Sequence, residues 1–275
     1  MTEDLIGTYE VRRLSSRRRM TIDGFDAVSP GHRIMGLMEL DVTRADARIE
    51  AMRRAGQRVS RFAFMVACIA TALDEHRELN AIRSGRKLLR FDDVDVNMSI
   101  ELPTPDGPYP HPLVIRRAST KSATEIYAEI EAARQRHSVA ENVSPGNRSV
   151  ERAMRWLGLL PRFLRLWVLR RVVAAPLAVK RWSGTTFVTS VGKFASAPGF
   201  VIPFAAGPMA VSFALGSVVD KPVLRGEDLR NHAFLALTVI VNHDLVDGGP
   251  AARFAHRLQQ LVESAAGLPD GGDEA

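Results

Sequence analysis

VNHDLVDGGPAARF, residues 241–254, places a histidine directly after a run of apolar β-forming residues and just before the start of a helix. The preceding segment 233–242 has the composition of a buried strand, and Pro250 suits the first position of a helix. We therefore expect His243 and Asp247 in a short strand-to-helix loop, where a rigid scaffold commonly holds reactive side chains. In isolation the two residues are equally compatible with a turn and a helix cap.

The rest of the chain mixes helical and strand patterns. Apolar residues at helical spacing predict three helices before the motif: 43–56, 60–76 and 122–137. Alternating or β-branched runs predict five strands: 91–102, 113–118, 185–192, 207–218 and 233–242. The proline-rich stretch 103–112 is expected to be a turn, and 221–231 a hairpin connection. The mixture predicts an α+β protein.

Composition limits the class of protein. A chain of 275 residues with 46% hydrophobic residues can bury a large core as one domain. Its single cysteine, Cys68, excludes an intrachain disulfide and a cysteine-rich zinc site, and we expect it to be inert packing in the helix 60–76. No secretory signal or long apolar span is visible, which predicts a cytoplasmic protein. The end, 267–275, is expected to be a disordered tail.

The net charge of +6 is concentrated in two arginine clusters, one near the N-terminus and one between 148 and 181. No base-reading motif accompanies them, so we expect no nucleic-acid partner. The segment 149–180 mixes Leu, Trp and Arg and is broken by Pro161 and Pro176, which predicts two or three short helices. Two interpretations remain: a helical lid packed on the protein, or a contact of 150–180 with a membrane surface that would make the protein peripheral.

Several segments together resemble one family. The motif of 241–254, RRRMT (17–21), FDDVDVNMSIELP (91–103) and FVTSVG (187–192) occur in the order seen in the catalytic domain of the dihydrolipoamide acyltransferases of 2-oxoacid dehydrogenase complexes. The resemblance implies the chloramphenicol-acetyltransferase-like fold, a mixed β-sheet covered by helices, over a single domain at 1–266. The helical segment 149–180 would be an insertion. No lipoyl domain, lipoyl group or subunit-binding domain is expected on this chain.

The resemblance also implies the site residues. His243 would act as general base on the thiol of coenzyme A or on a hydroxyl, amine or thiol acceptor. Thr189, with Ser190 as the alternative, would donate to the oxyanion. Asp247 would hold the loop through an arginine, and Gly248 would let the backbone turn behind it. The arginine candidates are Arg13, Arg17 and Arg18.

The predicted activity is acyl transfer between a CoA thioester and a small-molecule acceptor, without a metal. The resemblance implies a homotrimer with active sites between subunits, in some relatives part of a larger assembly. The alternative is a non-catalytic trimeric scaffold or a membrane-associated member of the same fold. Two residues depart from the family pattern: Asn242 precedes the histidine where Asp is usual, and Asp244 follows it where Arg is usual. The changed charge is expected to alter the surroundings of His243.

Overall fold

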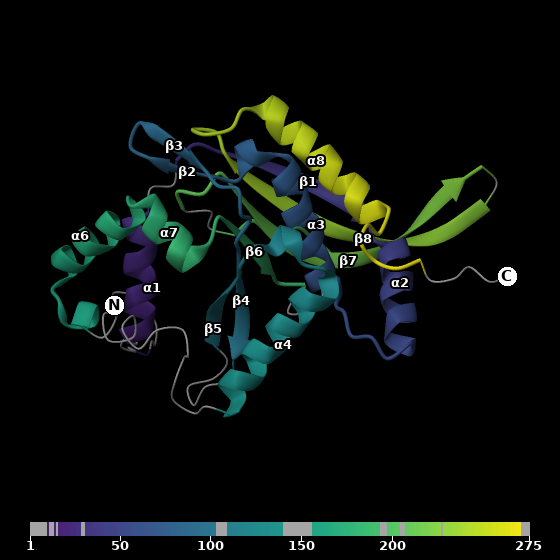
Figure 1. Cartoon of the computed structure of the whole chain (residues 1–275), viewed down its shortest axis with the longest axis horizontal. Helices are drawn as coiled ribbons and strands as arrows, with labels where there is room; N and C mark the ends of the chain where they lie inside the picture. Colours follow the sequence, from purple (N-terminus) through teal and green to yellow (C-terminus); the bar gives the residue numbers. More distant parts are fainter. Residues whose placement is uncertain are drawn as a thin grey trace, which may run out of the picture.

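A six-stranded mixed sheet with strand order β1-β8-β7-β6-β4-β5 forms the centre of the molecule (Figure 1). The computed structural model describes residues 10, 14, 16–28, 31–102, 109–139, 156–192, 197–203, 207–226 and 228–270. The central strands are β1 (Arg33–Asp41), β4 (Val96–Leu102), β5 (Tyr109–Ile115), β6 (Thr186–Ser190), β7 (Val211–Arg225) and β8 (Asp228–Asn242). β6 runs parallel to both of its neighbours, and the other pairings are antiparallel. A separate hairpin joins β2 (Ala81–Ser84) to β3 (Lys87–Arg90).

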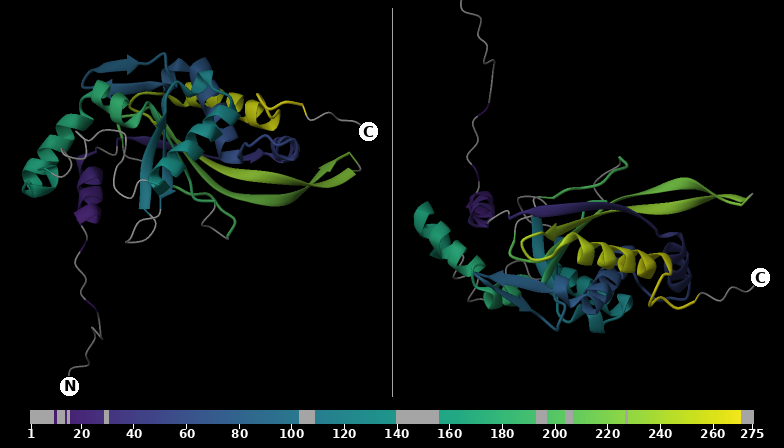
Figure 2. Two further views of the ribbon diagram at one scale, coloured as in Figure 1. Left: turned by 60° about the horizontal axis from the view of Figure 1, so that its bottom comes forward. Right: turned by 90° about the horizontal axis from the view of Figure 1, so that it is seen from above.

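Helices cover one face of this sheet (Figures 1 and 2). They are α2 (Thr43–Arg54), α3 (Arg61–Glu75), α4 (Ala123–Val139) and α8 (Gly248–Glu263). Local capping explains where two of them begin. The Ser60 hydroxyl accepts from the backbone N–H of Ala63, and Ser122 and Glu125 bond each other reciprocally before α4. The predicted α+β class and the three predicted helices are confirmed.

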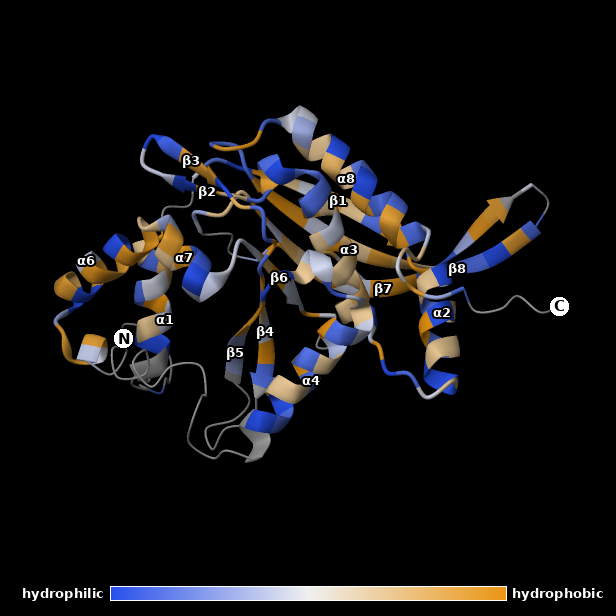
Figure 3. Cartoon of the chain, in the orientation of Figure 1, coloured by the Kyte–Doolittle hydropathy of each residue, from blue (hydrophilic) through white to orange (hydrophobic). Residues whose placement is uncertain are grey.

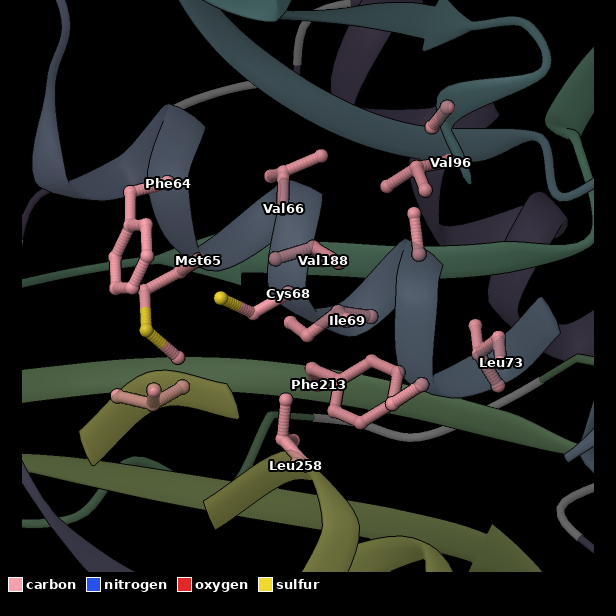
Figure 4. Packing of buried hydrophobic residues seen from close by; sticks show 14 of the residues in the cluster. Phe64, Met65, Val66, Cys68, Ile69, Leu73, Val96, Val188, Phe213 and Leu258 are labelled. Atoms are coloured by element: carbon pink, nitrogen blue, oxygen red, sulfur yellow. The ribbon is translucent and has the colours of Figure 1, made fainter. Parts of the chain in front are cut away.

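The core lies between α3 and the sheet (Figure 4). Phe64 of α3, Phe213 of β7 and Phe254 of α8 are fully buried, and the rings of Phe213 and Phe254 have centroids 5.7 Å apart. Cys68 is buried among them, and burial raises the pKa of its thiol to about 12. A thiol with so high a pKa is almost wholly protonated at neutral pH, which agrees with the prediction of inert packing.

Three helices gather at one end of the molecule, opposite the projecting β7–β8 hairpin (Figure 1). They are α1 (Ser16–Ala27), α6 (Arg162–Val173) and α7 (Pro176–Ser183). The predicted breaks at Pro161 and Pro176 are confirmed, whereas 149–155 lie outside the described residues. Within the described part of the chain, no helix is both long enough and apolar enough to cross a membrane.

Two predicted connections are wrong. Most of 221–231 is strand, because β7 and β8 continue their pairing to Arg225 and Asp228 and leave only a tight turn that includes Gly226 at φ +64°. Residues 109–112 belong to β5 rather than to a turn. β5 is the edge strand of the sheet, where proline costs no hydrogen bond on the open side. Of the predicted tail, 271–275 lie outside the described residues.

Candidate active site

His243 lies in the loop between the end of β8 and the start of α8, as predicted. Its Nδ1 lies 3.6 Å from Oδ1 of Asp247, the residue that immediately precedes α8. The His243 side chain is 46% exposed and that of Asp247 is 89% exposed. A carboxylate beside Nδ1 favours the tautomer that carries its proton on Nδ1, which leaves Nε2 as a base. His243 is therefore accessible to a substrate and suited to accept a proton.

The backbone of this loop is held by the start of β1. The N–H of His243 donates to the carbonyl of His32 at 2.8 Å and extends the β1–β8 ladder by one bond. Gly31, at φ +59°, lies against the side chains of Asn242 and Asp244, and a Cβ there would come within 3.2 Å of Asp244 Oδ2. A side chain at position 31 would therefore press on the loop that carries His243.

Sequence reasoning treated Asp244 only as a changed charge, whereas the structure gives its carboxylate specific partners. Its carboxylate accepts a hydrogen bond from His32 Nδ1 at 2.8 Å and lies 3.5 Å from an Arg83 guanidinium nitrogen. The bond from His32 holds the pKa of Asp244 below its ordinary value, and the arginine charges act in the same direction. Asp244 thereby connects the loop to the residue that precedes β1 and to β2, both of which are far from it in sequence. No pattern in the sequence pairs these residues.

Thr189 and Ser190 occupy the end of β6 and are half-buried. Thr189 pairs with Ala214 of β7, which in turn pairs with Thr238 of β8. His243 lies five residues beyond Thr238, which is about 16 Å along the direction of β8 at the usual strand rise. Across the sheet, β6 lies two strand spacings from β8, about 10 Å. Within one chain the two side chains are thus roughly 19 Å apart, far beyond hydrogen-bond reach. One chain does not unite the predicted base with the predicted oxyanion donor.

Glycines at both ends of β6 hold this strand in place. Gly184, at φ +67°, lies against the backbone of Asp95, and Gly192 lies against the carbonyl of Gly216. A Cβ at either glycine would approach a carbonyl oxygen more closely than real contacts allow. The position of Thr189 and Ser190 therefore depends on backbone contacts that only glycine permits.

The sequence model of the 2-oxoacid dehydrogenases acyltransferase (catalytic domain) matches residues 14–143 and 171–268 of this chain. The chain belongs to this family. Residues 144–170, which include more than half of α6, lie outside the match. Residues 171–180 fall within the match, so the unmatched residues cover only part of the segment 149–180.

Two curated relatives belong to 2-oxoacid dehydrogenase complexes. The chain is 26% identical over 216 residues to the dihydrolipoyllysine-residue acetyltransferase component of the pyruvate dehydrogenase complex of Mycoplasma pneumoniae, covering 78% of this chain and 44% of that protein. It is 24% identical over 237 residues to the lipoamide acyltransferase component of the branched-chain alpha-keto acid dehydrogenase complex of Bacillus subtilis, covering 83% and 46%. The chain thus spans less than half the length of either relative.

Solved structures confirm the predicted fold. The dihydrolipoamide acetyltransferase of Azotobacter vinelandii superposes with a TM-score of 0.68 at 18% identity, covering 98% of this chain and 97% of that one. A chloramphenicol acetyltransferase superposes with a TM-score of 0.50 at 12% identity, covering 92% and 98%. In the A. vinelandii enzyme the catalytic roles of a serine, a histidine and an asparagine were investigated, the last two four positions apart.

The arginine expected to hold Asp247 is not assigned by this acyltransferase-family structure. Arg13 and the side chain of Arg17 lie outside the described residues, and Arg18 is exposed on α1. Among described residues, the ion pair formed by Asp247 is the one with His243. Gly248 is the first residue of α8 and has open space around its Cα.

Proposed function

We propose that this chain catalyses acyl transfer between a CoA thioester and a thiol, hydroxyl or amine acceptor, with His243 as the general base. The observation that carries the proposal is the accessible imidazole of His243 beside the Asp247 carboxylate, in a strand-to-helix loop of an acyltransferase-family fold. Relatives that carry the names acetyltransferase and acyltransferase support the class of reaction. Acyl donor and acceptor are small molecules or lipoyl-like thiols, and no metal is required.

The chemistry follows from the tautomer of His243. Nε2 removes the proton of the attacking S–H, O–H or N–H as that atom bonds to the acyl carbonyl carbon. The carbonyl oxygen becomes an oxyanion in the tetrahedral intermediate. Collapse of the intermediate breaks the bond to the leaving thiolate, and the imidazolium returns the proton to it. Asp247 stabilises the imidazolium that exists between these two steps.

The predicted oxyanion donor does not come from the chain that supplies His243. We infer that Thr189, or Ser190 in its place, donates from a neighbouring subunit of a homotrimer, because the sheet register separates it from His243 in one chain. An uncovered apolar strip on the sheet supports association: the outer side of β1 exposes Met35 at 45% and Leu37 at 51%. Such exposed apolar side chains on a sheet face are typical of a protein–protein contact. Larger assemblies, as in multienzyme complexes, would build on the trimer.

The direct test is CoA-thioester turnover with a panel of acyl chain lengths and acceptors, in wild type, His243→Ala and His256→Ala. His256 is an exposed histidine of α8 and serves as the matched control. We expect a loss of about 10²- to 10⁴-fold in kcat for His243→Ala and little change for His256→Ala. Equal background signals from all three proteins across the panel would contradict the proposal and favour the non-catalytic scaffold.

A further inference from the structure

The outward face of α6 carries aromatic side chains where a surface helix ordinarily carries charge. Phe163 is 70% exposed and Trp167, one turn later, is 63% exposed. Arg162 and Arg165 point the other way: their guanidinium nitrogens lie 3.1 Å and 2.5 Å from the carboxylate of Asp23 on α1. Two of the four arginines of α6 therefore pair with α1, while the exposed side of the helix carries apolar groups.

Exposed apolar groups continue onto the residues before α6 and onto α7, where the ribbon of Figure 3 also carries hydrophobic residues. We call this the α6–α7 surface. Its exposed apolar residues are Trp156, Leu159, Phe163, Leu164, Trp167, Val172, Leu177 and Trp182. Isolated exposed apolar residues are ordinary, but a group of this size on adjacent helices marks a surface that binds something.

The charge on this surface has one sign. Residues 156–184 contain six Lys or Arg and no Asp or Glu. Three of the six form ion pairs within the protein: Arg162 and Arg165 with Asp23, and Lys180 with Asp95 at 3.7 Å. Arg170, Arg171 and Arg181 remain exposed beside the aromatic groups. A second copy docking through the same surface would bring these arginines against one another, which is unfavourable. An anionic partner fits both the charge and the apolar groups.

We propose that the α6–α7 surface docks on an anionic lipid bilayer. Trp and Phe would lie at the headgroup level with Leu reaching the acyl boundary, while the arginines bind lipid phosphates. The exposed apolar and basic residues of α6 lie on its outer side, while Arg162 and Arg165 hold the helix to Asp23 of α1. They can therefore contact a bilayer without any change in the core. Most of α6 lies in residues that the family model does not match, so docking is an addition to the family's machinery. The inference goes beyond acyl transfer and does not depend on it.

Intrinsic fluorescence tests this directly. The chain has three tryptophans, Trp156, Trp167 and Trp182, and all three belong to the α6–α7 surface. With the full chain, we expect vesicles containing phosphatidylglycerol to shift the emission to shorter wavelength and to sediment the protein. Vesicles of phosphatidylcholine alone should do neither. High salt should weaken the binding, because the attraction between the arginines and the lipid is screened.

Paired substitutions separate docking from misfolding. Arg170→Gln with Arg171→Gln should weaken binding to the anionic vesicles about 30-fold, since each arginine contributes about fivefold at such a surface. Phe163→Ser with Trp167→Ser should abolish sedimentation. The matched control is Leu224→Ser with Leu229→Ser, two residues of the distant β7–β8 hairpin exposed at 67% and 65%. It should bind as wild type does. Circular dichroism checks that each variant is folded.

Two results would overturn the inference. One is equal binding of the wild type and the folded α6–α7 variants to anionic vesicles. The other is a lower oligomeric mass of those variants in light scattering without a change in vesicle binding, which would assign the surface to a protein contact. CoA-thioester turnover is measured separately in solution, so failure of docking and failure of acyl transfer remain distinguishable.

Discussion

Asp244 shows how a single departure from a family pattern gains meaning from its partners. In the sequence it is only an acid where arginine is usual. In the structure its carboxylate accepts a hydrogen bond from His32 Nδ1 at 2.8 Å and lies 3.5 Å from a guanidinium nitrogen of Arg83. Asp244 also directly follows the proposed base, His243, in the chain. We interpret Asp244 as a positioning residue: it acts on His243 by fixing the loop, because His32, just before β1, and Arg83 of β2 both precede it by more than 150 positions.

Asp244→Ala is expected to lower kcat about tenfold, because misplacing a reactive group by an ångström costs one to two orders of magnitude. The free energy of unfolding should change little, since the partners of Asp244 are exposed. Steady-state kinetics and urea unfolding check both statements. Asp92→Ala, which removes another surface carboxylate paired with an arginine at 3.0 Å, is the control. Unchanged kinetics in Asp244→Ala would rule out the positioning role.

The long β7–β8 hairpin projects from the sheet, and its root is fixed by contacts with the corner between β1 and α2 (Figure 2). His232 Nδ1 donates to Asp41 Oδ2 at 2.5 Å, and the backbone N–H of Thr43 donates to the other oxygen at 3.0 Å. The Thr43 hydroxyl in turn accepts from the N–H of Ala233 at 2.8 Å. Asp41 and His232 are both mostly buried. Sequence patterns missed this corner because its partners are 190 and 191 positions apart in the chain.

Asp41→Asn should lower the free energy of unfolding by about 1–3 kcal/mol at neutral pH, the usual value of hydrogen bonds to a charged group. Burial alone would raise the pKa of Asp41, but hydrogen bonds from Thr43 and His232 outweigh it and hold the pKa below its ordinary value. A carboxyl with a lowered pKa stabilises the fold fully above its unfolded pKa, about 3.9. The contribution is lost as the pH falls through the lower folded value.

Urea unfolding of wild type and Asp41→Asn between pH 7 and pH 3 therefore has a defined outcome. The difference in unfolding free energy should stay constant down to about pH 4 and shrink below it. Asp220→Asn, at an exposed carboxylate of the same hairpin, should match wild type throughout. If the difference in unfolding free energy between wild type and Asp41→Asn is the same at pH 3 as at pH 7, the charge of Asp41 is not its source.

For the whole molecule, the separation of Thr189 from His243 has the largest consequence. Thr189 lies in β6 and His243 in the loop that follows β8, and the register of β6, β7 and β8 keeps their backbones roughly 19 Å apart. A rigid sheet cannot bring them together by a local movement. If both act on one substrate, the active site must include two subunits, and an isolated monomer must be nearly inactive.

Mixed assemblies test this. His243→Ala and Thr189→Ala chains are each expected to be nearly inactive, but random mixing at equal amounts should restore about a quarter of wild-type turnover, because one site in four then combines two intact residues. Co-expression with two affinity tags, followed by turnover measurements, provides the comparison. Mixing Thr189→Ala with a chain carrying both substitutions should restore nothing. Recovery in neither mixture, with hetero-oligomers present, would refute a shared site.

Local sequence patterns predicted the main helices, most of the central strands and the candidate site residues. Capping at Ser60 and Ser122, the breaks at Pro161 and Pro176, and the strand-to-helix loop of His243 depend on neighbours within a few positions, so local patterns contain them. Three features arise from the tertiary arrangement: Thr189 lies far from His243, Asp244 contacts His32 and Arg83, and Phe163 and Trp167 face solvent. These features depend on which strands pair and in which register. That choice rests on packing across the whole chain, which no short segment encodes.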